Sequence, residues 1–240
     1  AGMLAMNPEI LVLDEPTAML DPQGRADIMH ILDELQQHGT TIILVTHHRD
    51  EFVNADRIIR LDNGRIVQSA RGNTASIPEM DESDTAQEDN PIAKSNIANG
   101  ASKPTSAVPI IEIRNLIYQY PNSSKPVLDK LSITINKGET VAITGHNGAG
   151  KTTLARLLCA LDQPQSGNIT INTIPVARQR ANGNMQSLKR ADREKLRATV
   201  GYVMQHPERQ LFAETVAEDI AYGPRNQHLD ETQVSERDNQ

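Results

Sequence analysis

The sequence has few of the residues that stabilise small secreted domains and no long apolar run of the kind that crosses a membrane. It contains one cysteine, no tryptophan and 2% aromatic residues in a length of 240. The single thiol, Cys159, excludes an intramolecular disulfide and suits a reducing compartment. The longest apolar runs, such as residues 10–13 and 42–45, are far shorter than the roughly 20 residues that span a bilayer. The core must therefore be built from aliphatic side chains.

The net charge is negative, which bears on the partners to expect. The chain has 31 acidic residues against 24 lysines and arginines, a formal charge of −7. This balance argues against a protein that coats nucleic acid. A basic run between Lys189 and Arg197 is interpreted as the solvated face of a helix rather than a nucleic-acid site. We therefore expect no nucleic-acid partner.

Residues 1–69 form the first region with regular hydrophobic patterns. Residues 10–13 are a short apolar run, residues 23–38 repeat apolar side chains at helical spacing, and residues 41–46 are a second apolar run. A strand, a helix and a strand in this order predict a βαβ unit with parallel, buried strands.

A predicted hairpin ends this region, and a polar segment follows it. Residues 57–61 and 65–69 flank Asn63-Gly64, a dipeptide typical of tight β-hairpins. Residues 70–108 are rich in Ser, Thr, Asn, Asp, Glu and Pro, with only isolated apolar side chains. Such a composition predicts a flexible acidic linker. A partner-binding segment that folds on contact is the alternative.

Regular patterns return in residues 109–240. Apolar and alternating runs predict several strands, and a helix is expected to begin after Gly150. The predicted strands lie around residues 111–116 and at residues 131–135, 140–144 and 199–204.

The strongest local motif is residues 145–152, GHNGAGKT, which matches G-x-x-x-x-G-K-[ST] between a predicted strand and a predicted helix. Glycines let successive backbone N–H groups face phosphate oxygens, and the following helix offers its positive end to the same anion. Lys151 can reach the β- and γ-phosphates, and the Thr152 hydroxyl can bind Mg²⁺. A glycine-rich turn without a ligand is the alternative.

A second candidate site follows the buried strand at residues 10–13. Asp14 and Glu15 stand at its end, where one carboxylate can hold Mg²⁺ through water and the other can accept a proton from attacking water. His47 ends the next predicted strand, so it could face the same phosphate. Many strands end in acidic residues, and a histidine at a strand end is often a packing residue or a helix cap, so these alternatives stay open.

Together these motifs resemble those of ATP-binding cassette (ABC) ATPases. The runs LVLDEPTAMLDP and TTIILVTHH resemble the Walker B motif, D-loop and H-loop of that family, GHNGAGKTT resembles its Walker A motif, and VGYVMQHPE resembles its Q-loop. The run QHPERQLFAETVAEDIAYGPRN is most similar to the branch of cobalt and energy-coupling-factor (vitamin) importers. The resemblance covers nearly all of the chain outside the acidic segment.

The resemblance implies a role for each matching residue. Asp14 would position Mg²⁺, Glu15 would polarise the attacking water, and Asp21 would reach the opposite cassette. Tyr120 would stack on adenine, although packing against the sheet is the alternative for it; Gln205 would contact Mg²⁺ or the attacking water, unless it is only a polar residue at a strand end. The implied catalytic residues are Glu15, His47 and Gln205. The implied metal ligands are Asp14, Thr152 and Gln205. The implied ATP-binding residues are Tyr120, Gly145, His146, Asn147, Gly148, Ala149, Gly150, Lys151, Thr152 and Thr153.

The order of the motifs differs from that of a whole cassette. In the family the order is Walker A, Q-loop, LSGGQ signature, Walker B and H-loop, whereas here Walker B and the H-loop come first and the signature is absent. The implied fold is an α/β P-loop NTPase (a RecA-like ABC core) in two incomplete halves joined by a disordered linker. We expect residues 1–69 to end a first cassette and residues 109–240 to begin a second, in a fragment of a tandem protein. A circularly permuted single cassette is the alternative.

The implied function is the ATPase of an ABC-type importer for a metal ion or vitamin, with ATP and Mg²⁺ as cofactors. The implied partners are a transmembrane subunit near the Q-loop and a second cassette in cis, on the cytoplasmic side of the membrane. The fragment by itself is expected not to hydrolyse ATP, since no motif set is complete. The alternatives are a soluble tandem-cassette ATPase unrelated to transport and a regulatory nucleotide-binding module without turnover.

Overall fold

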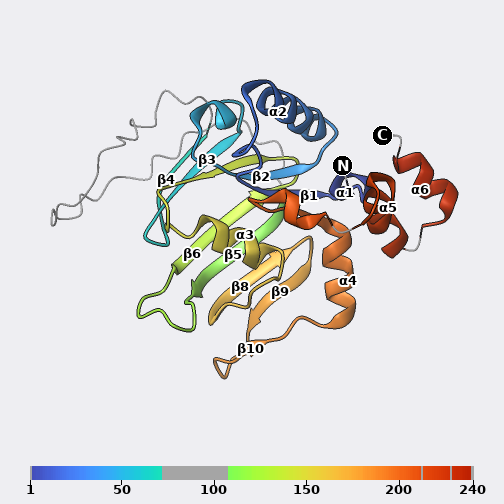
Figure 1. Cartoon of the computed structure of the whole chain (residues 1–240). Helices are drawn as coiled ribbons and strands as arrows, with labels where there is room; N and C mark the ends of the chain where they lie inside the picture. The colour runs from blue at the N-terminus through green and yellow to red at the C-terminus, as the bar shows by residue number, and fades with distance from the viewer. Residues whose placement is uncertain (1, 72–107, 212, 228, 239–240) are drawn as a thin grey trace.

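The computed structural model describes residues 2–71, 108–211, 213–227 and 229–238. Most of the predicted acidic linker lies outside these residues, so its interpretation stays a prediction. Strands β4, which ends at Arg71, and β5, which begins at Pro109, border the undescribed segment (Figure 1).

A six-stranded sheet contains strands from both predicted regions. Its order is β11-β1-β2-β7-β3-β4, in which β4 is antiparallel to β3 and the other neighbours are parallel. The first region supplies β1 (Ile10–Asp14), β2 (Thr41–Val45), β3 (Arg57–Asp62) and β4 (Arg65–Arg71). The second region supplies β7 (Thr140–Thr144) and β11 (Val200–Val203).

The burial of β1 and β2 explains why the two regions join. Every residue of both strands is buried, so each strand needs a neighbour on both edges and cover on both faces. Strand β11 pairs with the free edge of β1, and β7 pairs with that of β2. The sequence predicts two separate half-cassettes, whereas in the structure their strands form one sheet; the assignment of each region to a different cassette stays a prediction.

A second, five-stranded antiparallel sheet has the order β10-β9-β8-β5-β6. The hairpin of β8 and β9 is absent from the sequence prediction, because its turn lacks an Asn-Gly or Asp-Gly pair. The turn residues Asn172 and Thr173 both adopt positive φ, 44° and 68°, as a two-residue hairpin turn requires. The strands are β5 (Pro109–Tyr118), β6 (Leu128–Asn136), β8 (Ser166–Ile171), β9 (Ile174–Gln179) and β10 (Met185–Gln186).

The helices cover the six-stranded sheet on both faces. Helix α2 (Pro22–Gln37) packs Leu32 against one face, with Leu11 and Ile42. Helix α3 (Lys151–Leu158) lies on the other face, in a core shared with the five-stranded sheet (Figure 1). Figure 1 also shows α1 (Gly2–Ala5) beside α5 (Val216–Asn226), near α6 (Glu231–Asp238). The remaining described helices are α4 (Arg190–Thr199) and the 3-10 helices η1 (Arg49–Phe52) and η3 (Pro207–Gln210).

Three details of the helices correct or refine the sequence reading. The helix expected after Gly150 is α3, which ends at Leu158, and Leu161 beyond its end is 51% exposed. Cys159 follows the helix, and burial raises the pKa of its thiol to about 12, so the thiol stays protonated at neutral pH. Among the described residues, none of the helices has the length and apolar character that a membrane crossing requires.

Candidate functional site

Asp14, the last residue of β1, meets the first turn of α3. Its carboxylate is 1% exposed and accepts a hydrogen bond from Thr152 Oγ1 at 3.2 Å and a longer one from Tyr202 OH at 3.5 Å. Burial raises the pKa of Asp14, and the hydrogen bond from Thr152 acts against this effect. The contact brings together two of the three predicted metal ligands, one from each half of the sequence.

Glu15 contacts the other two predicted catalytic residues. Its Oε1 lies 3.2 Å from His47 Nδ1, and its Oε2 accepts a hydrogen bond from Gln205 Nε2 at 2.8 Å. Glu15 adopts a positive φ of 49°, which is not a strand conformation, so the strand ends at Asp14. Three residues that are distant in the sequence therefore meet at one carboxylate.

The glycine-rich loop has a backbone that only glycine adopts without strain. Gly145, Gly148 and Gly150 have φ values of 144°, 84° and 101°. A Cβ at Gly145 would lie 2.2 Å from the Leu61 carbonyl oxygen, at the end of β3. The backbone of the loop therefore packs directly against the backbone of β3, which leaves no space for a side chain at residue 145.

Lys151 begins α3 and is folded onto this loop. Its ammonium donates hydrogen bonds to the carbonyl oxygens of Gly145, at 2.8 Å, and His146, at 3.2 Å. The residue is 6% exposed. Burial lowers the pKa of Lys151, while the carboxylates of Glu15 and Asp14 act in the opposite direction. A buried ammonium between a loop and two acidic residues is suited to bind an anion that enters the loop.

The remaining predicted ATP-binding residues surround the loop. The Tyr120 hydroxyl lies 3.0 Å from Thr153 Oγ1, and its ring stands perpendicular to that of Tyr118 at 5.0 Å. Tyr120 keeps 40% exposure, which leaves part of its ring open for stacking. His146 lies with Nδ1 2.7 Å from the Asn147 carbonyl oxygen and Nε2 2.7 Å from Asp62 Oδ1. The role of Tyr120 in adenine binding stays a prediction.

The turn between β3 and β4 contacts both the loop and the backbone of residue 127, and the second of these contacts can be tested. Gly64 N donates to the Ala149 carbonyl oxygen at 3.2 Å, and a Cβ at Gly64, where φ is 73°, would lie 2.2 Å from the Val127 carbonyl oxygen. Gly183 has a similar φ of 85° but nothing within 4 Å of its Cβ position. We expect Gly183→Ala to cost about 1–2 kcal/mol for the left-handed backbone alone. Gly64→Ala should cost about 1–3 kcal/mol more, because the backbone of residue 127 must move. Urea unfolding measures both, and equal midpoints would contradict the close contact.

The residues at the site fit Mg²⁺, provided that phosphate supplies further ligands. The donors are the buried Asp14 carboxylate and the adjacent Thr152 hydroxyl, both hard oxygen groups. Within the described ranges, no group of three or more His, Cys, Asp or Glu side chains could hold a metal ion. This donor set matches the way proteins hold Mg²⁺, with one or two carboxylates and the phosphates of a substrate. Gln205, the third predicted ligand, contacts Glu15 and so lies within the same group of side chains.

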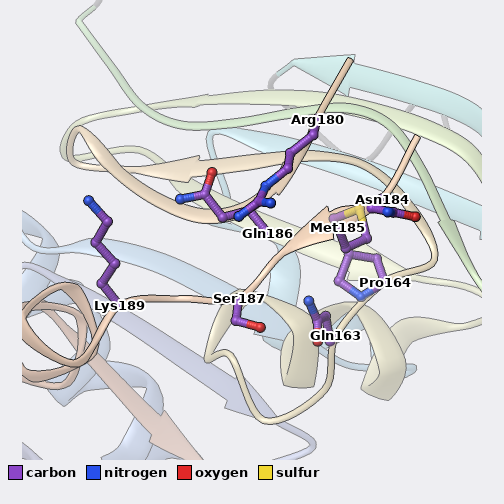
Figure 2. Close-up of a pocket in the computed structure, with 8 residues that line it drawn as sticks. All are labelled: Gln163, Pro164, Arg180, Asn184, Met185, Gln186, Ser187 and Lys189. Atoms are coloured by element: carbon purple, nitrogen blue, oxygen red, sulfur yellow. The ribbon is translucent and has the colours of Figure 1, made fainter. Parts of the chain in front are cut away.

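Two features lie apart from this group. Asp21 accepts a hydrogen bond from Gly24 N at 2.8 Å and caps α2. Its contact with a second cassette stays a prediction. A hollow of about 760 Å³ is lined by residues 163–164, which follow α3, and by residues of the segment 180–189, which contains β10. Figure 2 shows the Arg180 and Lys189 side chains among its polar lining. None of the predicted site residues lines this hollow.

The sequence analysis did not identify two residues that contact the site or its neighbours, Tyr202 and Glu51. Tyr202 lies in β11 and donates to Asp14, and burial raises its pKa so that it stays a donor at neutral pH. Its position inside the strand predicted at residues 199–204 was the signal available. Glu51 follows His48 in a polar run that is typical of a solvated turn, yet it is 2% exposed.

Comparison with known proteins shows which family this chain resembles. Residues 128–239 match the family described as ABC transporter. The chain is 48% identical over 263 aligned residues to an ABC transporter ATP-binding protein of Bifidobacterium longum, an alignment that covers 99% of this chain and 34% of that protein. An ABC transporter ATP-binding protein of Methanosarcina mazei is 31% identical over 227 residues, with 94% of this chain and 41% of that protein covered.

Solved structures are also similar to this chain, and one of them is cbiO1 from Clostridium perfringens, described as part of the ABC transporter complex cbiONQ. The match is 30% identical, has a TM-score of 0.44, and covers 54% of this chain and 47% of that one. The chain spans about a third to two fifths of the length of the two relatives described above, at 34% and 41%.

Proposed function

Because this chain belongs to the ATP-binding protein family of ABC transporters and carries its α/β P-loop fold, we propose that it binds ATP at residues 145–152 and takes part in ATP hydrolysis that drives transport. The observation that carries this proposal is the meeting of Glu15 with both His47 and Gln205. The group lies next to the Asp14–Thr152 contact at the start of α3. A phosphate-binding loop and a positioned carboxylate are the two parts that hydrolysis of a phosphoanhydride needs.

The contacts support a role for each side chain. Lys151 binds the β- and γ-phosphates in exchange for its contacts with the loop carbonyls, and Asp14 and Thr152 would hold Mg²⁺. When bound, Mg²⁺ would neutralise charge on the phosphate oxygens. Glu15 accepts a hydrogen bond from the attacking water, and His47 and Gln205 fix the direction of its carboxylate. Tyr120 stacks on the adenine ring through its exposed part.

We also propose that the parent protein holds two cassettes in tandem. The order of the motifs supports this, because the acids of residues 14–15 precede the loop of residues 145–152. The relatives are longer than this chain, since it covers 34% and 41% of the two described above. Two cassettes of the same fold have equivalent halves, so in the full-length protein each site contact described above would form with the equivalent residue of the same cassette. In this chain β1 and β2 instead pair with β11 and β7 in one sheet. A protein with both cassettes is called the full-length protein below.

The run after Gln205 supports a proposal for the partner and for the transported substrate. Its resemblance to cobalt and vitamin importers supports uptake of a metal ion or vitamin, with the ATPase on the cytoplasmic face of the membrane. Three large apolar side chains of this run, Leu211, Val216 and Tyr222, are 67%, 76% and 53% exposed. We propose that a transmembrane subunit covers these side chains.

Copurification tests the proposal. Full-length protein extracted from membranes in mild detergent should carry a stoichiometric integral membrane protein and release phosphate from ATP. Leu211→Asp should lower the yield of that membrane protein at least about tenfold, since a buried charge at an interface costs more than 1.4 kcal/mol. Leu161→Asp is the matched control, because Leu161 is similarly exposed but follows α3. Phosphate release without a membrane partner would favour a soluble tandem ATPase, and ATP binding without release would favour a regulatory module.

A further inference from the structure

A second buried carboxylate lies directly behind the proposed catalytic group. Glu51 belongs to η1, and its side chain is 1% exposed. Its Oε1 accepts a hydrogen bond from the Thr17 hydroxyl, and its Oε2 accepts one from Thr46 Oγ1 at 2.5 Å. Arg25 Nε, on α2, lies 3.8 Å from Oε1. Glu51 thus joins side chains from three other parts of the first region.

The two threonines are attached to the residues of the site. Thr46 immediately precedes His47, and its Oγ1 also accepts a hydrogen bond from His48 N at 3.0 Å. Thr17 is two residues after Glu15, and both threonines are almost fully buried, at 1% and 0% exposure. Glu51 therefore holds the segment that carries Glu15 and the segment that carries His47 at a fixed separation.

The energetics make this arrangement rigid. A buried carboxylate is stable only when hydrogen bonds and an opposite charge replace its hydration. Glu51 has two hydroxyl donors and the guanidinium of Arg25 in these roles. Removal of either hydroxyl leaves a carboxylate oxygen without that donor, at a cost of about 1–3 kcal/mol. A small shift of either segment is therefore unfavourable.

We propose that Glu51 is a positioning residue, which fixes the Glu15–His47 contact through Thr17 and Thr46. Glu51 does not touch that contact itself; the contact is the 3.2 Å approach of His47 Nδ1 to Glu15 Oε1. The kinetic part of this inference rests on the proposed function, since it assigns hydrolysis to the same side chains. The structural part concerns the contact alone.

Kinetics of the full-length protein test the catalytic consequence. Thr46→Val removes the hydroxyl but keeps the shape, and Glu51→Gln removes the charge. Both should lower kcat by about ten- to a hundredfold, the range expected for a misplaced catalytic group, with KM for ATP nearly unchanged. Thr46→Ser keeps the hydroxyl and should restore most of kcat. In a His47→Ala background, Glu51→Gln should have little further effect, because its action runs through the contact already lost.

Asp50→Asn is the matched control. Asp50 neighbours Glu51 in η1 and also faces Arg25, at 3.6 Å, but its side chain is 74% exposed. It should leave kcat unchanged. A loss of stability in Thr46→Val and Glu51→Gln with no change of kcat would overturn the proposal and assign Glu51 a purely structural role.

Nuclear magnetic resonance of this chain tests the contact without any activity. Glu15→Gln should shift the imidazole resonances of His47, since the two side chains touch. Glu51→Gln and Thr46→Val should shift the same resonances, whereas Asp50→Asn should not. Unchanged His47 resonances would overturn the proposal. A full-length protein that hydrolyses no ATP would instead refute the proposed function, and the resonances would still decide the role of Glu51.

Discussion

A Lys151→Ala variant of the full-length protein is expected to lose ATP binding at residues 145–152, with an affinity at least about 100-fold weaker. The ammonium is buried under the loop, with Gly145 and His146 carbonyl oxygens as its hydrogen-bond acceptors. Charge-assisted hydrogen bonds contribute about 1.5–3 kcal/mol each, and the phosphates of ATP would receive more than one from this group. Alanine leaves the charges of the β- and γ-phosphates without this cation.

Titration of the purified variant with a fluorescent ATP analogue measures this loss. Lys195→Ala is the matched control, because Lys195 is exposed on α4 and should leave the affinity unchanged. Urea midpoints of both variants should stay close to that of the wild type. Burial lowers the pKa of Lys151, which means that the folded state gains little from its charge, so its removal should not unfold the protein. An unchanged affinity at this loop would refute the assignment of the ATP site.

The loop could be predicted from the sequence because everything that defines it is local. Its glycines, its lysine and its threonine lie within eight consecutive residues, 145–152, between a strand and a helix. The Asn63-Gly64 hairpin was predicted for the same reason, and the structure confirms β3 and β4 on either side of it. Asp14, Glu15 and His47 could be singled out because each stands at the carboxyl end of a buried strand.

The contacts of these residues could not be predicted in the same way. Glu51 reaches Thr17 across 34 positions, and nothing in the run around it distinguishes a buried acid from a solvated one. The hairpin of β8 and β9 was missed because Asn172 and Thr173 do not form a typical turn pair. Local pattern identifies which residues can carry chemistry, whereas side-chain partners depend on how distant segments pack.

The joining of the two regions in one sheet also depends on how distant segments pack. A strand such as β1, buried along its whole length, cannot remain an edge strand, but its sequence does not say which strand will pair with it. Val200–Val203 is a suitable neighbour because it is itself an apolar parallel strand. In a tandem protein, the strand of the first cassette that is equivalent to β11 would pair with residues 10–14 in the same way. The burial of β1 therefore explains why it pairs with β11. Functional assays decide whether Glu15 acts on ATP bound at residues 145–152.

A Glu15→Gln variant tests this. It is expected to lose most ATP hydrolysis at the site where Glu15 acts, while ATP still binds there. Glutamine keeps the shape and a hydrogen-bond acceptor towards Gln205 and His47, but it cannot take a proton from water. General bases contribute about 10²–10⁴-fold in rate, so hydrolysis at that site should fall by at least about 100-fold. Retained nucleotide binding separates this effect from that of Lys151→Ala.

The two variants together distinguish the architectures. In a tandem protein Glu15 and Lys151 serve different ATP sites, so Lys151→Ala should reduce the bound ATP from two molecules to about one, and the remaining hydrolysis should still depend on Glu15. In a permuted single cassette both residues serve one site, and either variant alone should remove all turnover. This chain by itself should release no phosphate, because a cassette site needs a signature segment that its sequence lacks. Phosphate release by this chain that disappears in Glu15→Gln would contradict the tandem arrangement and establish Asp14, Glu15 and Lys151 as parts of one working site.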